Sequence, residues 1–242
     1  MYLIKEGSFS TQNPIYQHIS VEDGKMFIPE ARVAKDYFAT NFYEKGYIDW
    51  CINNNFIQAD KNVIDVGAHI GWYSVNFAKC AKHVYSFECS PKSFNYLCAN
   101  IALNKQDYKV TTFNTGLSDK NGTTKYYIRD PHDGGGNGIT KFQGDANTPC
   151  IDVPIKTLDS YELSNVNFIK IDVEGHEKQV LLGASKTIIE NNYPSILFEC
   201  WDDSPDKSHL PTKQLRDELF EVFNQFEYKI QHIGLDMYIA KR

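Results

Sequence analysis

The chain has 242 residues, of which 42% are apolar and 14% aromatic, so it can bury a sizeable core and is not disordered as a whole. Its formal charge of −6 and the absence of any run rich in lysine and arginine argue against nucleic acid as a partner. No stretch approaches the roughly 18 apolar residues that a membrane span needs. The N-terminus has no signal-peptide pattern, and the six cysteines form no C-x-x-C pair, so a reducing, cytoplasmic location is expected.

Residues 1–60 are predicted to form an N-terminal extension to a domain that spans residues 61–242. Within the extension, residues 19–28 place Asp23-Gly24 between two alternating arms, which predicts a β-hairpin. Residues 31–57 are richer in helix formers, with aromatics at helical spacing that usually pack in a core. We expect a lid or a homodimer contact. The alternative is a substrate mouth lined by Tyr43, Tyr47 or Trp50.

From residue 62 onward, strand-like and helix-like segments alternate. Strands are predicted before Gly67 and at 83–88, 109–118, 168–173 and 195–201, helices at 91–104, 176–192 and 212–226, and a terminal strand pair at 228–233 and 237–240. Alternation of this kind is typical of βαβ units. The fold expected is therefore α/β and Rossmann-like, with a mostly parallel, doubly wound sheet and an antiparallel C-terminal strand.

Two segments interrupt this pattern. Residues 119–122 lead into 123–128, which predicts an antiparallel hairpin that continues from the third strand. Residues 130–149 contain Gly134 to Gly138 and few large apolar side chains, so we expect a mobile surface loop. This loop is either a linker or a flap over the active site.

The stretch from Asn62 to Trp72 reads as a turn that binds a nucleoside cofactor. An apolar strand runs into Asp65-x-Gly67-x-x-x-Gly71, and the two glycines let the backbone turn sharply and approach a ligand. A dinucleotide turn would have Gly-x-Gly-x-x-Gly there. A carboxylate in that place would repel pyrophosphate, whereas it would accept hydrogen bonds from an ammonium group. The turn therefore favours S-adenosylmethionine, unless Asp65 only caps the turn.

Glu88 ends the next strand, some 20 residues after the glycine turn. A carboxylate in this place typically accepts hydrogen bonds from the two ribose hydroxyls of a nucleoside cofactor. The alternative is a solvent-exposed strand end. Asp65 and Glu88 end neighbouring strands at the ligand-binding edge of an open sheet, which favours the cofactor interpretation.

Several segments occur in an order that resembles a known family. They are Val63-Ile-Asp-Val-Gly-Ala-His-Ile-Gly71, Phe87-Glu88 with Pro91, Phe94, Leu97, Asn100 and Asn104, Gly116-Leu-Ser-Asp-Lys-Asn-Gly122, Thr157-Leu-Asp159, Phe168-Ile-Lys-Ile-Asp-Val-Glu-Gly-His-Glu177 and Ile196-Leu-Phe-Glu199. Over about residues 61–201 the chain resembles the FkbM family of S-adenosylmethionine-dependent methyltransferases. The resemblance implies a class I methyltransferase fold and methylation of hydroxyls, commonly on sugars or natural-product scaffolds.

The resemblance also implies a set of cofactor-binding residues. These are Asp65, Gly67, His69, Gly71, Glu88, Cys89, Ser118 and Asp172. Two of them depart from the family pattern, because His69 stands where Asn is usual and Cys89 stands where Pro is usual. Both are expected to shape the cofactor pocket.

A second polar cluster follows the fourth strand. Asp172, Glu174, His176 and Glu177 should project over the carboxyl edge of the sheet. His176, by its ordinary pKa, is the expected general base, with Asp172 and Glu174 as further catalytic residues. Asp172 would bind the acceptor hydroxyl or the ammonium group of the cofactor. In the alternative interpretation, His176 only begins a helix and Glu177 complements its dipole.

The fifth strand adds Glu199 and Trp201, an acid beside an aromatic that would suit a sugar ring, so Glu174, Glu199 and Trp201 are the expected substrate-binding residues. Asp172, Glu174 and Glu199 would suit a divalent metal ion, which is compatible with the sequence but not favoured. The predicted activity is methyl transfer to a hydroxyl of a sugar, nucleotide-activated or glycan-bound. The alternatives are a nicotinamide-dependent oxidoreductase, a non-catalytic sugar- or partner-binding module, and RNA methylation, which the acidic charge disfavours.

Overall fold

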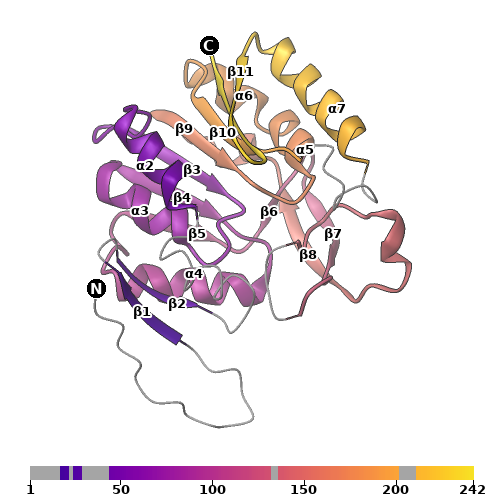
Figure 1. Ribbon diagram of the computed structural model, residues 1–242, viewed down its shortest axis with the longest axis horizontal. Helices are drawn as coiled ribbons and strands as arrows, with labels where there is room; N and C mark the ends of the chain where they lie inside the picture. Colours follow the sequence, from indigo (N-terminus) through magenta and orange to yellow (C-terminus); the bar gives the residue numbers. More distant parts are fainter. Residues whose placement is uncertain (1–16, 22–23, 29–43, 132–135, 202–210) are drawn as a thin grey trace.

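The computed structural model describes residues 17–21, 24–28, 44–131, 136–201 and 211–242. Its centre is a seven-stranded sheet in the order β11-β12-β10-β9-β3-β4-β5 (Figure 1). The strands are β3 (Asn62–Val66), β4 (His83–Phe87), β5 (Val110–Phe113), β9 (Val166–Ile171), β10 (Ser195–Glu199), β11 (Lys229–Gly234) and β12 (Met237–Lys241). The five strands from β5 to β10 are parallel, and β12 runs antiparallel to β10. This confirms the predicted Rossmann-like sheet with its antiparallel C-terminal strand.

Helices cover both faces of the sheet, because successive side chains of a buried strand point to opposite sides. In β3, Val63 packs in a core with α2 (Lys45–Asn53), α3 (Trp72–Cys80) and α4 (Pro91–Leu103). Its neighbour Ile64 packs in a second core with α5 (Glu177–Leu182), α6 (Ser185–Glu190) and α7 (Thr212–Gln225). The sheet is therefore doubly wound, as predicted.

The strand order reverses between β3 and β9. From β3 the chain moves outward through β4 to β5, and it then returns to the other side of β3 as β9 (Figure 1). Ligands of open α/β sheets bind in the crevice at the carboxyl ends of the strands at such a reversal. The residues that follow β3, β4 and β9 are Gly67, Glu88 and Asp172.

A second, three-stranded sheet is inserted after β5, and here two predictions were wrong. The strand predicted over 109–118 ends at Phe113, and β6 (Gly116–Leu117) joins the inserted sheet with β7 (Gly122–Tyr127) and β8 (Cys150–Lys156). The order is β6-β8-β7, so β7 pairs with β8 and not with the strand before it. In β8, Val153 and Ile155 are buried on one face while their neighbours are exposed. This half-buried strand lies between β6 and β7, so that β6 and β7 do not pair with each other.

The helix predicted over 176–192 is broken into α5 and α6. A Cβ on Gly183 would lie 1.9 Å from the backbone oxygen of Ser118, so the chain passes very close to the inserted sheet at this point. Asp159 then caps the new start, because its carboxylate accepts hydrogen bonds from the backbone N–H groups of Lys186 at 3.0 Å and Thr187 at 2.7 Å. Contacts distant in sequence therefore divide the helix.

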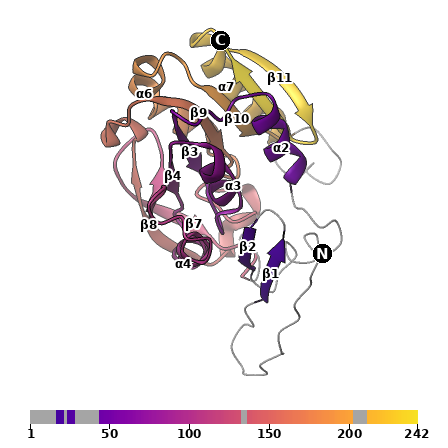
Figure 2. The same ribbon diagram turned by 90° about the vertical axis from the view of Figure 1, so that its left-hand side faces the viewer.

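The predicted hairpin is confirmed, because β1 (Gln17–Val21) and β2 (Gly24–Ile28) pair antiparallel. This hairpin lies beside α4 (Figure 2). The Tyr47 hydroxyl donates to the oxygen of Gly234 at 2.9 Å, and the ring of Trp50 lies 5.3 Å from that of Phe56, so both are partly buried against the core. Tyr43, most of the aromatic segment before it, and Gly134 of the glycine-rich loop lie outside the described residues. None of the described helices is both long and apolar enough to cross a bilayer.

Candidate active site

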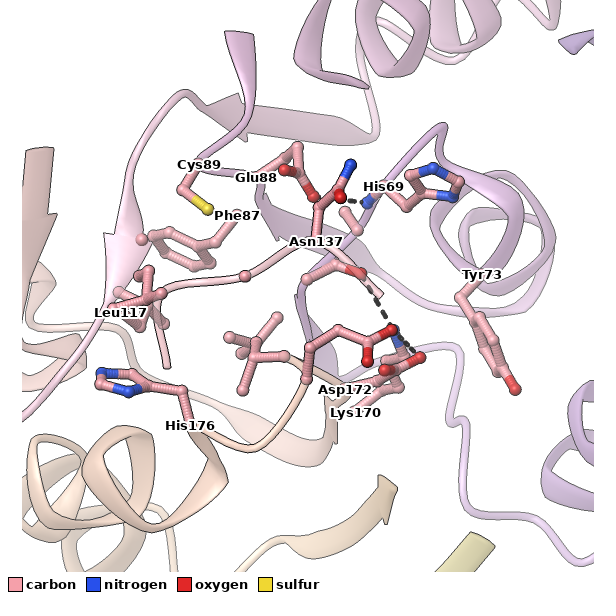
Figure 3. A pocket seen from close by; sticks show the side chains of 18 of the residues that line it. His69, Tyr73, Phe87, Glu88, Cys89, Leu117, Asn137, Lys170, Asp172 and His176 are labelled. Carbon is pink, nitrogen blue, oxygen red and sulfur yellow. Dashed lines mark hydrogen bonds and ion pairs between the residues drawn. The ribbon is translucent and has the colours of Figure 1, made fainter. Parts of the chain in front are cut away.

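A cavity of about 1060 Å³, its open mouth included, lies at the carboxyl ends of β3, β4 and β9. We call it the central cavity. It is lined by Glu44, 66–70, Trp72, Tyr73, 87–89, 115–117, Tyr126, 137–139, Lys170, 172–174 and His176. Figure 3 shows Glu88 and His69 on one wall, with Asp172 and Lys170 on the wall opposite. Its mixture of apolar walls with a few polar groups is typical of a small-molecule site.

Gly67 forms the turn at the base of the central cavity. It has a left-handed φ of 73°, and a Cβ there would lie 1.9 Å from the backbone oxygen of Asp172. The N–H groups of Gly67 and Ala68 both donate to the oxygen of Phe87 at 3.0 Å, which ties the turn to β4. Gly71 is outside the cavity lining, since a Cβ there would instead meet Leu97 of α4 at 2.8 Å. Gly71 therefore serves helix packing, where cofactor contact was expected.

Glu88 lines the central cavity and is 6% exposed, which rules out the alternative of a solvent-exposed strand end. One carboxylate oxygen accepts the N–H of His69 at 2.8 Å, and the other accepts the N–H of Ser90 at 2.7 Å. Burial raises the pKa of Glu88 to about 7, while these two hydrogen bonds oppose the rise. Each oxygen keeps a further lone pair that can accept a hydrogen bond from a ligand.

The two residues that depart from the family pattern both line the central cavity. His69 has a left-handed φ of 51° and follows the glycine turn, and Cys89 follows Glu88. Burial raises the pKa of the Cys89 thiol well above its ordinary value, so this thiol stays neutral and acts as a small apolar wall. Ser118, in contrast, is outside the lining, and its hydroxyl lies 3.0 Å from Nε2 of His176.

Asp65 is placed differently from the expectation of a carboxylate aimed at the cofactor. Its side chain is fully buried inside β3, where it accepts a hydrogen bond from the Ser74 hydroxyl at 2.5 Å and pairs with the Lys170 ammonium at 3.7 Å. It does not line the central cavity. The short Asp65 side chain is held under α3 by Ser74, whereas Glu88 and Asp172 lie one residue beyond the ends of their strands.

Lys170 is the main functional candidate that the sequence did not single out. It lines the central cavity while being 2% exposed. A lysine between Ile169 and Ile171 in an apolar strand was the available signal, since lysine is almost never fully buried without a partner. Glu44 and Asn137 also line the cavity. Asn137 belongs to the glycine-rich loop that was predicted to be a linker or a flap, whereas no local pattern marks Glu44. Glu44 reaches the cavity only through the tertiary fold.

Asp172, Glu174 and Glu199 come together as predicted, with one oxygen of each within 4.8 Å of the others. Glu174 has a left-handed φ of 57° and accepts the N–H of Gly136 at 2.9 Å. Glu199 and Trp201 are hydrogen-bonded to each other at 3.0 Å and line a smaller neighbouring cavity. The expected substrate residues are therefore divided between two adjoining hollows. A divalent ion at the three carboxylates stays a prediction.

His176 and Glu177 begin α5 and are both largely buried. Burial lowers the pKa of His176 to about 4, although the charge of Asp119 opposes the shift. Its imidazole is therefore neutral at physiological pH and a weaker base than its ordinary pKa suggests. Figure 3 places it beside Leu117, across the central cavity from Asp172. The Glu177 carboxylate accepts the N–H groups of Val173 at 3.0 Å and Gly175 at 3.3 Å, so it shapes the loop before the helix.

The described part of the glycine-rich loop covers the central cavity with Asn137, Gly138 and Ile139. Arg129 organises this segment. Its guanidinium pairs with Asp145 at 2.6 Å, donates to the oxygen of Gly136 at 2.8 Å, and lies 4.5 Å from the ring centre of Phe142. The loop is thus a wall of the cavity in this structure.

Known proteins resemble this chain in sequence and in fold. Residues 65–229 match the Methyltransferase FkbM domain. The hexuronic acid methyltransferase AglP of Haloferax volcanii is 27% identical over 180 residues, which cover 68% of this chain and 71% of that protein.

Two solved structures share the fold. Methyltransferase FkbM from Methylobacillus flagellatus aligns with a TM-score of 0.52 and 16% identity. The alignment covers 76% of the present chain but only 44% of the Methylobacillus protein. A putative caffeoyl-CoA O-methyltransferase from Staphylococcus aureus aligns with a TM-score of 0.51 and 13% identity, over 87% of this chain and 91% of that one. Because the family match covers more than half of its length, the chain belongs to the FkbM methyltransferase family.

Proposed function

We propose that the protein transfers a methyl group from S-adenosylmethionine to a hydroxyl of a sugar. The observation that carries the proposal is the Glu88 carboxylate, which lies in the wall of a cavity beside the Gly67 turn, at the strand reversal of the sheet. The lone pairs that remain on this carboxylate suit the two ribose hydroxyls of the cofactor.

The rest of the central cavity fits the same cofactor. Phe87, Leu117 and Ile139 supply apolar walls suited to an adenine ring. Asp172, whose side chain is 25% exposed, supplies a negative charge for the ammonium group. Bound S-adenosylmethionine would supply a methyl group activated by its positively charged sulfur.

Glu174 is the residue that we assign to the acceptor proton. It lines the central cavity beside Asp172, and the N–H of Gly136 orients its carboxylate. As the acceptor oxygen forms its bond to the methyl carbon and the carbon–sulfur bond breaks, Glu174 would take the hydroxyl proton. General-base assistance of this kind contributes typically about 10²- to 10⁴-fold to the rate. His176, at the other end of the cavity and with a lowered pKa, is better suited to shape the cofactor site.

A sugar acceptor is supported by two observations. Glu199 and Trp201 place a carboxylate and an indole ring next to the central cavity, and such a pair suits the hydroxyls and the apolar face of a sugar. The relative from Haloferax volcanii is a hexuronic acid methyltransferase. We therefore expect a sugar or nucleotide-sugar acceptor, with uronic acids tested first.

Calorimetry with S-adenosylmethionine and S-adenosylhomocysteine tests the cofactor, and Glu88→Ala is expected to bind both at least about tenfold more weakly because buried hydrogen-bond acceptors are lost. Mass spectrometry after incubation with labelled cofactor and a panel of nucleotide sugars and uronic acids tests the acceptor. No binding of either compound would refute the proposal. Binding without transfer to any acceptor would favour a non-catalytic module, and thermal stabilisation by NAD would favour an oxidoreductase.

A further inference from the structure

Lys170 lies in β9, beside β3, and the central cavity lies at the carboxyl ends of these two strands. Lys170 lies opposite Asp65 in the register of β3 and β9, and Asp65 lies opposite Ser86 in the register of β3 and β4. The Ser74 hydroxyl, from α3, contacts both Asp65 and Ser86. A polar row therefore crosses three strands beneath the cavity, inside an otherwise apolar core.

The ammonium group of Lys170 contacts three polar groups and the ring of Tyr73, whose centre lies 5.0 Å away. Its Nζ lies 3.0 Å from the oxygen of Gly67, 3.3 Å from Oδ2 of Asp172 and 3.7 Å from Oδ1 of Asp65. An ammonium group has three N–H donors; the oxygens of Gly67 and Asp172 lie within hydrogen-bonding distance, whereas Asp65 pairs with Lys170 through charge. The polar contacts of Lys170 are therefore with other residues of the site.

Two of these partners, Gly67 and Asp172, are parts of the site whose positions must be held. Gly67 forms the turn, and Asp172 is the member of the charged set that solvent reaches. The two already touch along the backbone, as the 1.9 Å approach of a Gly67 Cβ to the Asp172 oxygen shows. Lys170 adds a second tie, from the Gly67 oxygen to the Asp172 carboxylate.

The charges explain why the lysine stays ionised there. Burial lowers the pKa of Lys170, but the charges of Asp172 and Asp65 outweigh this and raise it overall. Burial likewise raises the pKa of Asp65, and the charge of Lys170 opposes that rise. Removing Lys170 alone would leave Asp65 buried without a counter-charge, which is strongly destabilising, whereas neutralising both groups is often tolerated.

We propose that Lys170 is a positioning residue whose buried ammonium group holds the Asp172 carboxylate and the Gly67 turn in the arrangement that receives the amino acid end of the methyl donor. Asp65 is the counter-charge of Lys170 and does not contact the donor. This inference rests on the proposed use of S-adenosylmethionine, because it concerns where Asp172 points.

The test is a set of variants of the full chain in an Asp65→Asn background. In this background the buried lysine can be removed without leaving the Asp65 carboxylate buried and unpaired. Asp65→Asn alone is expected to bind S-adenosylmethionine within about threefold of wild type, since Asn still accepts from Ser74. Adding Lys170→Met should keep the thermal unfolding temperature close to that of Asp65→Asn but weaken binding at least about tenfold, as expected for a lost charge-assisted contact. Lys125→Met, which removes an exposed pair with Asp152, is the matched control and should bind as wild type.

Coupling to Asp172 separates positioning from a structural role. Asp172→Asn should weaken binding about tenfold in the Asp65→Asn background, and much less once Lys170→Met is also present, because residues that act through one another are not additive. Two outcomes would overturn this inference but leave the proposed function standing. They are additive losses of affinity from Asp172→Asn and Lys170→Met, and undiminished binding by the variant that carries both Asp65→Asn and Lys170→Met. A loss above about tenfold in Asp65→Asn would do the same, since it would make Asp65 a donor contact. If the Met variant does not fold, Lys170→Gln in the same background, which retains an N–H donor for Gly67, is judged by the same criteria. Failure of the wild-type protein to bind S-adenosylmethionine would refute the proposed function itself.

Discussion

Glu88 is shielded from water at the position where the proposed function needs a negative charge. Because burial raises its pKa to about 7, the folded protein holds a proton that the unfolded chain, near 4.5, has already released. Stability is therefore fully present below about pH 4.5 and is lost as pH rises through about 7. We expect the unfolding temperature of the unliganded protein to fall over this window, less so in Glu88→Gln. Glu177, with a pKa raised to about 7 by burial, acts in the same direction, whereas His176, with a pKa lowered to about 4, opposes the fall.

Cofactor binding should depend on pH in the opposite direction. Ribose hydroxyls donate hydrogen bonds, so they favour the ionised form of Glu88, which predominates only above about pH 7. Affinity for S-adenosylmethionine should thus rise with pH below that value, by up to about tenfold per pH unit. Calorimetry at a series of pH values would show this, and a flat profile would remove Glu88 from the ribose site.

His176 and Glu174 make a clear pair for comparison. With its pKa lowered to about 4, His176 contributes no titration near its ordinary value, and His176→Gln should lower kcat less than about tenfold. Glu174→Gln should lower kcat by about 10²-fold or more if Glu174 accepts the proton. Steady-state rates of the two variants would decide, and the reverse order would restore the base role to His176.

Among the structural elements, the turn after β3 leaves no room for a side chain at Gly67. Gly67→Ala would place a Cβ 1.9 Å from the Asp172 oxygen at a φ of 73°, so we expect a loss of more than about 2 kcal/mol in the free energy of unfolding. Gly144→Ala is the matched control, since a Cβ there has no atom within 4 Å. Denaturant unfolding of both variants is the measurement, and equal stability would mean that the turn is not fixed as described.

The segment around Arg129 is a second element whose role can be tested. Its guanidinium contacts Asp145, the oxygens of Gly136 and Thr140, and the ring of Phe142 at once. Arg129→Lys keeps the charge but loses the planar fork. We expect faster hydrogen exchange over residues 136–149 and weaker cofactor binding in this variant. Unchanged exchange would show that the loop is held by other contacts.

At the scale of the whole molecule, the N-terminal segment and the catalytic domain share one core. Ile48 and Cys51 of α2 pack with Val63 and Phe168 of the central sheet, and Glu44 lines the central cavity. A chain that starts at residue 61 should therefore unfold at a markedly lower temperature, since each large buried side chain removed costs about 2–5 kcal/mol. Thermal unfolding of chains that start at residues 44 and 61 would test this. Equal stability would make residues 1–60 a separate extension.

Metal dependence also belongs to the whole molecule. The three carboxylates of Asp172, Glu174 and Glu199 lie close enough to hold a cation, but the Lys170 ammonium already pairs with Asp172 and the Gly136 N–H with Glu174. We expect full activity after dialysis against a chelator. A loss that magnesium restores would show that the metal is required.

The amino-acid sequence by itself determined the family, the sheet and the positions of Glu88 and Asp172, because apolar runs and the residues that end them are local features. The partners of β8 and the break after α5 could not be predicted, since they depend on Ser118, Asp159 and the inserted sheet, which are distant in sequence. Only the tertiary structure decided which acid faces the central cavity. The short side chain of Asp65, inside β3, is covered by the helix on its face, whereas that of Glu88, just beyond β4, reaches the cavity. The register of β3 and β9 then gave Asp65 a lysine as its counter-charge.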